Sequence, residues 1–101
     1  MKFGGMNMQA MVRQAQKLQE QMLQAQQELE DAEIKGVSGG DLVTVTMNGK
    51  KKMSAITIKP AAVDPDDIEL LEDLILAAYN DALEKAEELE AKTMPNTGGL
   101  F

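Results

Sequence analysis

The sequence predicts an α+β domain with the element order α-β-β-β-α, in which two long helices accompany a small antiparallel sheet of three strands. Three observations carry this prediction. An apolar repeat of helical period occupies residues 8–29, a strand–turn–strand pattern occupies residues 41–59, and a second helical pattern follows residues 64–67. At 101 residues the chain is long enough for one small core and no more.

The first helix is predicted over residues 7–31. Its apolar residues are spaced alternately three and four apart, which is a heptad seam: Met8, Met11, Ala15, Leu18, Met22, Ala25 and Leu29. Asn7 is expected to cap its first turn, and residues 1–6, which contain Gly4 and Gly5, are expected to be flexible.

A β-hairpin is predicted next, centred on Asn48-Gly49, a dipeptide that supplies the positive φ angles of a tight turn. A loop of two or four residues puts Val43, Val45 and Met47 on one face together with Ser54, Ile56 and Ile58. Residues 32–38 form a candidate first strand. A hairpin this short is not stable by itself in water, so another element must cover it.

The second helix is predicted to start with Asp64 as its cap and Pro65 at its first position, and to run to about Lys92. Its main apolar face comprises Ile68, Leu71, Leu74, Ile75, Ala78, Tyr79, Ala82, Ala86 and Leu89. Leu70, Leu76 and Leu83 lie off that face, which indicates burial on more than one side. Residues 93–101 are expected to form a flexible tail, leaving residues 7–92 as the single folded domain.

These lengths favour a homodimer. The first helix would be about 35 Å long whereas strands of six residues span about 20 Å, so the apolar seam continues past the sheet and needs a second chain to cover it. The candidate interface on the second helix is Leu70, Leu74, Leu76, Tyr79 and Leu83.

The composition excludes several kinds of catalytic and metal-binding site. The chain has no Cys and no His, which removes disulfides, thiolate nucleophiles, imidazole bases and the commonest zinc ligands. Asp64, Asp66 and Asp67 lack the ligand spacing of a calcium loop and are explained by helix capping. We therefore expect no enzyme activity, no cofactor, no metal and no small-molecule substrate. The first residues match neither a signal peptide nor a membrane anchor, and a cytoplasmic location is expected.

The net charge of −7 is distributed unevenly along the chain. Residues 1–60 carry eight Lys and Arg against six Asp and Glu, whereas residues 61–101 carry two against eleven, which gives +2 and −9. Arg13 and Lys17 stand four apart on one helix face. The cluster Lys50, Lys51 and Lys52 lies at the hairpin tip, where it is either a second anion contact or simply a solvated turn.

Several runs of the sequence resemble the YbaB/EbfC family of small bacterial nucleoid-associated proteins. They are KFGGMNM, MVRQAQKLQEQM, GGDLVTVTMNG, AITI and LEDLILAAYNDALEKAEEL, in collinear order over nearly the whole chain. The resemblance implies a homodimer whose long helices project as arms and bind double-stranded DNA without chemistry, in the nucleoid, with a role in chromosome organisation. Two departures are Asp41, where the family often has a small residue, and the very acidic last helix.

On this resemblance the candidate DNA contacts are Lys2, Arg13, Gln16 and Lys17, with Lys50, Lys51 and Lys52 as a second set. Gln side chains can bond phosphates or base edges. The alternative function is a protein-interaction adaptor that uses its Met- and Gln-rich helix, or its acidic last helix, to hold a basic partner.

Overall fold

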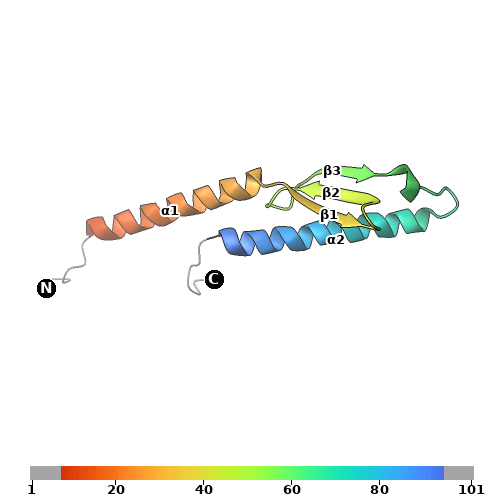
Figure 1. Ribbon diagram of the computed structural model, residues 1–101. Coiled ribbons are helices and arrows are strands. Elements are labelled where there is room, and N and C mark those ends of the chain that lie inside the picture. The colour runs from red at the N-terminus through yellow and green to blue at the C-terminus, as the bar shows by residue number, and fades with distance from the viewer. Residues whose placement is uncertain (1–7, 95–101) are drawn as a thin grey trace.

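The computed structural model describes residues 8–94 and has the predicted α-β-β-β-α order (Figure 1). Its elements are α1 (Met8–Asp31), β1 (Ile34–Ser38), β2 (Val43–Met47), β3 (Met53–Ile58), the short 3₁₀ helix η1 (Pro60–Ala62) and α2 (Ile68–Thr93). The expected flexible start, the Asn7 cap and residues 95–101 of the expected tail lie outside the described residues. The helix α2 ends one residue later than predicted, with Met94 as its C-cap.

The sheet is antiparallel with the strand order β1-β2-β3. Val43 lies opposite Ile58 and Val45 lies opposite Ile56, so these residues share a face as predicted. An irregularity at Thr46 and Met47 then places Met47 opposite Met53, and the predicted loop of two or four residues is wrong. Five residues separate the two strands instead.

The turn between β2 and β3 is built differently from the prediction. The positive φ angle is at Lys51 (71°), and Gly49 is not in the left-handed region. The side-chain oxygen of Asn48 accepts hydrogen bonds from the backbone N–H groups of Lys50 (2.8 Å) and Lys52 (3.0 Å), which stabilises the wider loop. The expected tight Asn-Gly turn is therefore wrong, and the glycine serves another purpose, described below.

The start of α2 also differs from the prediction. Asp67, not Asp64, is the N-cap, and its carboxylate accepts a hydrogen bond from the N–H of Leu70 at 3.2 Å. Asp64 instead closes a turn before the helix, because its carboxylate accepts from Asp66 N–H and its carbonyl accepts from Asp67 N–H, both at 2.9 Å. Pro65 lies in that turn and is not the first helical residue.

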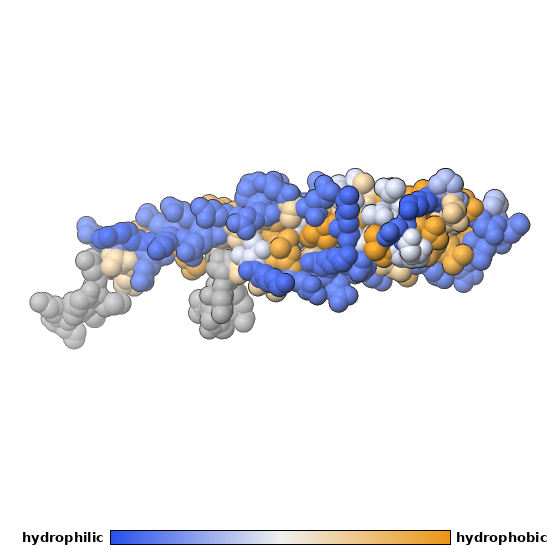
Figure 2. All heavy atoms as spheres, in the orientation of Figure 1, coloured by the Kyte–Doolittle hydropathy of each residue, from blue (hydrophilic) through white to orange (hydrophobic). Residues whose placement is uncertain are grey.

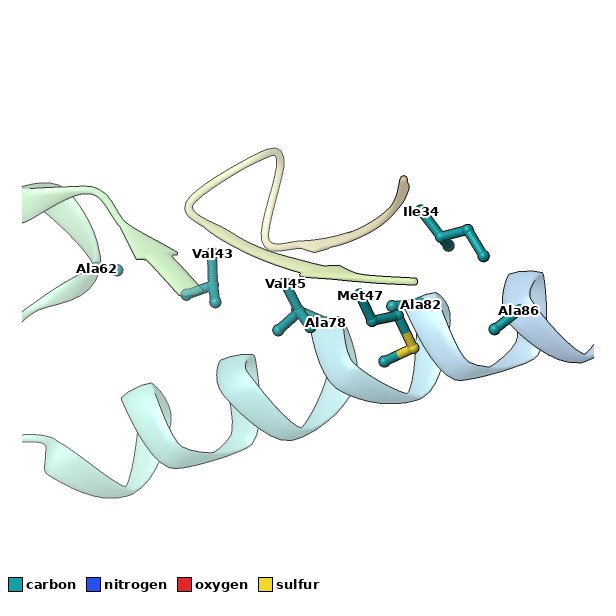
Figure 3. Packing of buried hydrophobic residues seen from close by; sticks show 8 residues of the cluster. All are labelled: Ile34, Val43, Val45, Met47, Ala62, Ala78, Ala82 and Ala86. Atoms are coloured by element: carbon teal, nitrogen blue, oxygen red, sulfur yellow. The ribbon is translucent and has the colours of Figure 1, made fainter. Parts of the chain in front are cut away.

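The core lies between α2 and the first two strands. Ala78, Ala82 and Ala86 are spaced four apart along one stripe of α2 and are fully buried. They face β2, whose alternate residues Val43, Val45 and Met47 point toward the helix, as Figure 3 shows. The rest of the predicted apolar face of α2 packs around this centre, except Ile68, which is 49% exposed.

A glycine lets α2 approach β1 at backbone contact. A Cβ atom on Gly36 would lie 2.2 Å from both the carbonyl oxygen of Ala78 and the backbone nitrogen of Ala82. Neither atom belongs to a flexible side chain, so no other residue fits at position 36 in this packing. The small residues on both sides bring the helix unusually close to the strand.

Side chains from α2 also occupy the outer edge of β1. The Val37 N–H donates to Asp81 Oδ2 at 3.0 Å, and Lys85 Nζ donates to the Lys35 carbonyl at 2.9 Å. Asp81 and Lys85 pair with each other at 3.1 Å. The hydrogen bond from Val37, and then the bond from Lys85, lower the pKa of Asp81 below its ordinary value of 3.8. Backbone groups that would otherwise be open at this edge are therefore partnered.

The third strand has no such cover. Because α2 lies against β1 and β2, all six residues of β3 are exposed, including Ile56 at 45%. Apolar atoms are visible over this end of the molecule in Figure 2. The face that the sequence predicts to be apolar is therefore only half covered within one chain.

The helix α1 projects from the domain, as the length argument predicts (Figure 1). Of its heptad seam only Ala25 and Leu29 are buried, at 5% and 2% exposure, and Met22 is half-buried. The remaining seam residues are exposed. We refer to residues 8–24 as the arm.

We expect Gly36→Ala to destabilise the fold by about 3 kcal/mol or more, because the added methyl group must push the α2 backbone away from β1. Urea denaturation followed by circular dichroism measures this loss. A cost below about 1 kcal/mol would show that the helix can move off the strand freely.

We expect Asp81→Asn to remove a pH-dependent part of the stability. Because the pKa of Asp81 is lowered in the folded chain, its contribution is present above 3.8 and is lost as the pH falls through the folded-state pKa. The free energy of unfolding of the variant should therefore lie below that of the original chain at pH 7, and the gap should shrink as the pH falls below 3.8.

Urea denaturation at several pH values measures that gap. Asp73→Asn, which makes the same charge change on an exposed part of α2, is the control and should show no comparable narrowing. An Asp81→Asn gap that stays constant as the pH falls well below 3.8 would contradict the assignment.

Candidate functional site

The arm presents two basic side chains on the face opposite its apolar seam. At 100° per residue, Arg13 and Lys17 lie together on one side of α1, whereas Met11, Ala15 and Leu18 lie on the other. Both basic residues are exposed, and neither makes an ion pair within residues 8–94. Gln16 is exposed beside Lys17, and Lys2 lies outside the described residues. The structure thus leaves these two cations available to an anion.

Charge changes sign along α1. Residues 8–19 contain Arg13 and Lys17 and no carboxylate, whereas residues 20–31 contain four carboxylates and no cation. The first turn carries no acidic residue, so the positive end of the helix dipole adds to the basic side chains. The outer half of α1 is therefore the positive half, and Figure 2 shows the visible surface of the arm to be mostly hydrophilic.

The lysines of the β2–β3 turn lie elsewhere and are largely engaged. Lys50 pairs with Glu30 at 3.7 Å and Lys51 pairs with Glu90 at 3.4 Å, whereas Lys52 is exposed. The turn meets the carboxyl end of α1, about 24 Å along the helix from Arg13. The structure therefore does not bring the two predicted basic sets together.

The candidate interface residues on α2 fall into three environments. Leu74 is half-buried in the chain's own core, where its backbone carbonyl accepts a hydrogen bond from the Ser38 hydroxyl. Tyr79 and Leu83 are also half-buried. Leu70 and Leu76 are the exposed members, at 49% and 59%.

Sequence reasoning named the interface candidates on α2 and the apolar residues of β3 but did not place them side by side. Leu76, Leu83 and Glu90 are seven apart on one stripe of α2, and Glu90 pairs with Lys51 of the β2–β3 turn. This stripe therefore borders the sheet on the β3 side, next to the uncovered Ile56 and Ile58. We call Ile56, Ile58, Leu76, Tyr79 and Leu83 the open face. The alternation in β3 showed that its residues are apolar but not which strands α2 would cover.

Other kinds of site find no support in the described part of the chain. Residues 8–94 hold no cluster of three or more carboxylates placed to bind a metal ion. Neither α1 nor α2 is long and apolar enough to cross a membrane.

The chain is similar to bacterial proteins over almost its whole length. A nucleoid-associated protein of Clostridium novyi is 53% identical over 98 residues, which cover 96% of this chain and 86% of that protein. A nucleoid-associated protein of Chloroflexus aurantiacus is 47% identical over 96 residues, covering 94% and 96% respectively.

Among solved structures, an uncharacterized protein of Helicobacter pylori matches with a TM-score of 0.74 at 21% identity, over 86% of this chain and 91% of that one. This likeness supports the fold. The sequence profile of the YbaB/EbfC DNA-binding family matches residues 3–100. With that match and relatives at about half identity, the chain belongs to the YbaB/EbfC DNA-binding family.

Proposed function

We propose that the chain is a nucleoid-associated protein of the bacterial cytoplasm that binds double-stranded DNA as a homodimer, without catalysis and with little sequence specificity. The observation that carries the proposal is the exposed pair Arg13 and Lys17 near the outer end of a projecting helix, with no carboxylate partner among residues 8–94. Arg and Lys on a helix face are the side chains that neutralise DNA phosphates. Family membership supports DNA as the polyanion.

The acidic second helix does not contradict this proposal, because of where its charge lies. The helix α2 packs along the sheet, and the arm continues past its carboxyl end (Figure 1). Charges are screened over about 8 Å at physiological salt. Arg13 lies about 24 Å along α1 from Leu29, where the helix joins the domain, so the repulsion from most of α2 is weak at the arm's outer end.

Little sequence specificity is proposed because base readout needs more than these side chains. Residues 8–94 include one aromatic residue, Tyr79, and it packs against the core, so the described chain offers no platform for stacking bases. Contacts from Arg13 and Lys17 to phosphates fix position on the duplex and carry no sequence information. Such binding suits a protein that organises the chromosome rather than one that marks a single site.

The homodimer is proposed to form through the open face. A three-stranded sheet covered on two strands leaves apolar side chains in water, and a second copy presenting the same residues would cover them. Leu76 is the most exposed leucine of this surface, whereas Leu70 lies on the other side of α2, nearer to Asp81 and β1. Two joined copies would present two basic arms, and binding by both raises affinity beyond that of either.

We expect the double variant Arg13→Ala, Lys17→Ala to weaken DNA binding and to flatten its salt dependence. A dimer loses four cations, so the slope of log K against log salt should fall by up to about 3.6, at about 0.9 for each phosphate neutralised. Fluorescence anisotropy with a generic duplex over a range of salt concentrations measures both quantities.

The matched control is Lys35→Ala, Lys59→Ala, which removes the same charge from the domain and should change the slope much less. Unchanged affinity in the arm variant would show that the DNA-binding residues lie elsewhere in the chain. An original chain that binds no duplex even at low ionic strength would favour the protein-interaction adaptor instead.

We expect Leu76→Glu to convert the dimer to a monomer without unfolding it. Leu76 is largely exposed within one chain, so a glutamate is tolerated there, but between two chains its charge would be buried. Light scattering at micromolar concentration should fall from about 22 kDa, twice the 11.0 kDa of one chain, to the mass of one chain. Ala77→Glu places the same charge on the neighbouring outer side of α2 and should remain dimeric. A monomeric original chain would remove the proposal.

A further inference from the structure

The turn formed by residues 48–52 meets the base of α1. We propose that Gly49 and Leu29 are positioning residues: the turn supports α1 at its last turn and so helps to fix the direction of the arm and the place of Arg13 and Lys17. The part of this proposal that concerns DNA rests on the proposed function, whereas the part that concerns the arm does not.

A backbone hydrogen bond joins the two elements. The Gly49 N–H donates to the Leu29 carbonyl at 2.6 Å, and both residues are buried. Carbonyls in the last turn of a helix have no partner within the helix and bond to other groups when they are buried. The Gly49 N–H therefore bonds to a carbonyl that is accessible because it lies in the last turn of α1.

The approach is too close for any side chain at position 49. A Cβ atom there would lie 2.8 Å from the Leu29 carbonyl oxygen and 2.9 Å from the Leu29 Cα, both of which are backbone atoms. Since Gly49 has no positive φ angle, the glycine is required for space and not for conformation. A larger residue can be accommodated only if α1 and the turn move apart.

The turn is itself held firmly. Asn48 ties it internally through the two hydrogen bonds described above. Lys51 joins it to Glu90 of α2, and Lys50 reaches Glu30 at the end of α1. The base of α1, the hairpin and α2 therefore meet at one junction, and the exposed ion pairs add to a contact whose main parts are apolar packing and the backbone bond.

Besides the turn, the helix α2 also contacts α1, and residues 8–24 extend beyond the buried part of the helix. From residue 8 to residue 24 every side chain is exposed except Met22, so the direction of the helix is decided at Ala25 and Leu29. A hollow of about 290 Å³ between the end of α1 and the start of β3, bordered by Asp31 and Lys52, leaves one side of the junction loosely filled. A displacement at the turn therefore has room to tilt the helix.

The length of the arm magnifies such a tilt. Arg13 lies sixteen residues from Leu29, or about 24 Å along the axis, so a tilt of about 10° moves it by about 4 Å. That is more than the rise of about 3.4 Å between phosphates along one DNA strand. A small change at the turn would therefore misplace the basic pair relative to the phosphate groups that it contacts.

The test measures the arm directly. The chain has no cysteine, so a Gln14→Cys, Glu84→Cys pair gives two unique spin-label sites, one on the arm and one on α2. Labelled chains are diluted with excess unlabelled chains so that pulsed electron resonance reports the distance within one chain. We expect Gly49→Ala to shift the mean distance by several ångströms, and Leu29→Ala to broaden the distribution, because the first pushes the helix and the second removes its packing.

Ala77→Gly is the matched control. It weakens an exposed turn of α2 without touching α1 and should leave the mean and the width of the distribution unchanged. Circular dichroism establishes that each variant is folded. Unchanged distributions in both folded Gly49→Ala and folded Leu29→Ala would overturn the proposal, whatever the DNA measurements show.

The DNA part is measured on the same variants without labels. We expect Gly49→Ala to weaken duplex binding at least about tenfold although it removes no charge, since two arms at the wrong separation no longer bind together. An arm that moves while the affinity stays the same would overturn the positioning role. If the original chain binds no duplex, the proposed function fails, and the distance measurement still tests the support of the arm.

Discussion

The backbone contact between α2 and β1 at Gly36 is the constraint on which the rest of the structure depends. It holds the helix over the first two strands rather than over the middle of the sheet, so β1 is deeply covered and β3 is bare. The same placement brings Asp81 and Lys85 to the outer edge of β1. This one close approach therefore leaves β1 covered and β3 exposed, with the open face where α2 borders β3.

The packed core and the exposed basic side chains of the arm lie in different parts of the molecule. The core is made of alanines, valines, one isoleucine and one methionine, and it includes no residue from 8–24. Those residues can therefore carry exposed cations and an uncovered apolar seam without changing the packing of α2 on the sheet. The cost is that a long helix is directed by a small junction, where a turn, a helix end and two ion pairs meet.

Much of the fold could be predicted from the sequence because its signals are periodic. The heptad seam, the alternation of β2 and the apolar face of α2 gave the element order and most of the core. The errors fall where local chemistry offered two equal choices. Asp64 and Asp67 are both good caps, and the chain uses the later one after a turn closed by the first. Gly49 suggested a tight turn, whereas its role is to admit Leu29, which a local pattern does not reveal.

The candidate site was predictable only in part for the same reason. The spacing of Arg13 and Lys17 put them on one face, and the structure shows that face exposed. Lys50 and Lys51 form ion pairs with residues that are 20 and 39 positions away in the sequence. These pairs depend on the tertiary fold and could not be predicted from local spacing. The exposure of β3 likewise followed from the lateral position of α2, which no periodicity specifies.

The occupied edge of β1 limits how copies of this chain can associate. A sheet with two open edges can add strands on both sides and polymerise, which is the route to fibres. Here Asp81 and Lys85 occupy the Val37 N–H and the Lys35 carbonyl on the β1 side, so β3 is the more open edge for another strand. In the homodimer proposed above, the β3 sides of two copies meet and only their β1 sides face outward, so the sheet would not grow beyond two copies. The proposed DNA-bound dimer would thus form without aggregating through its own sheet.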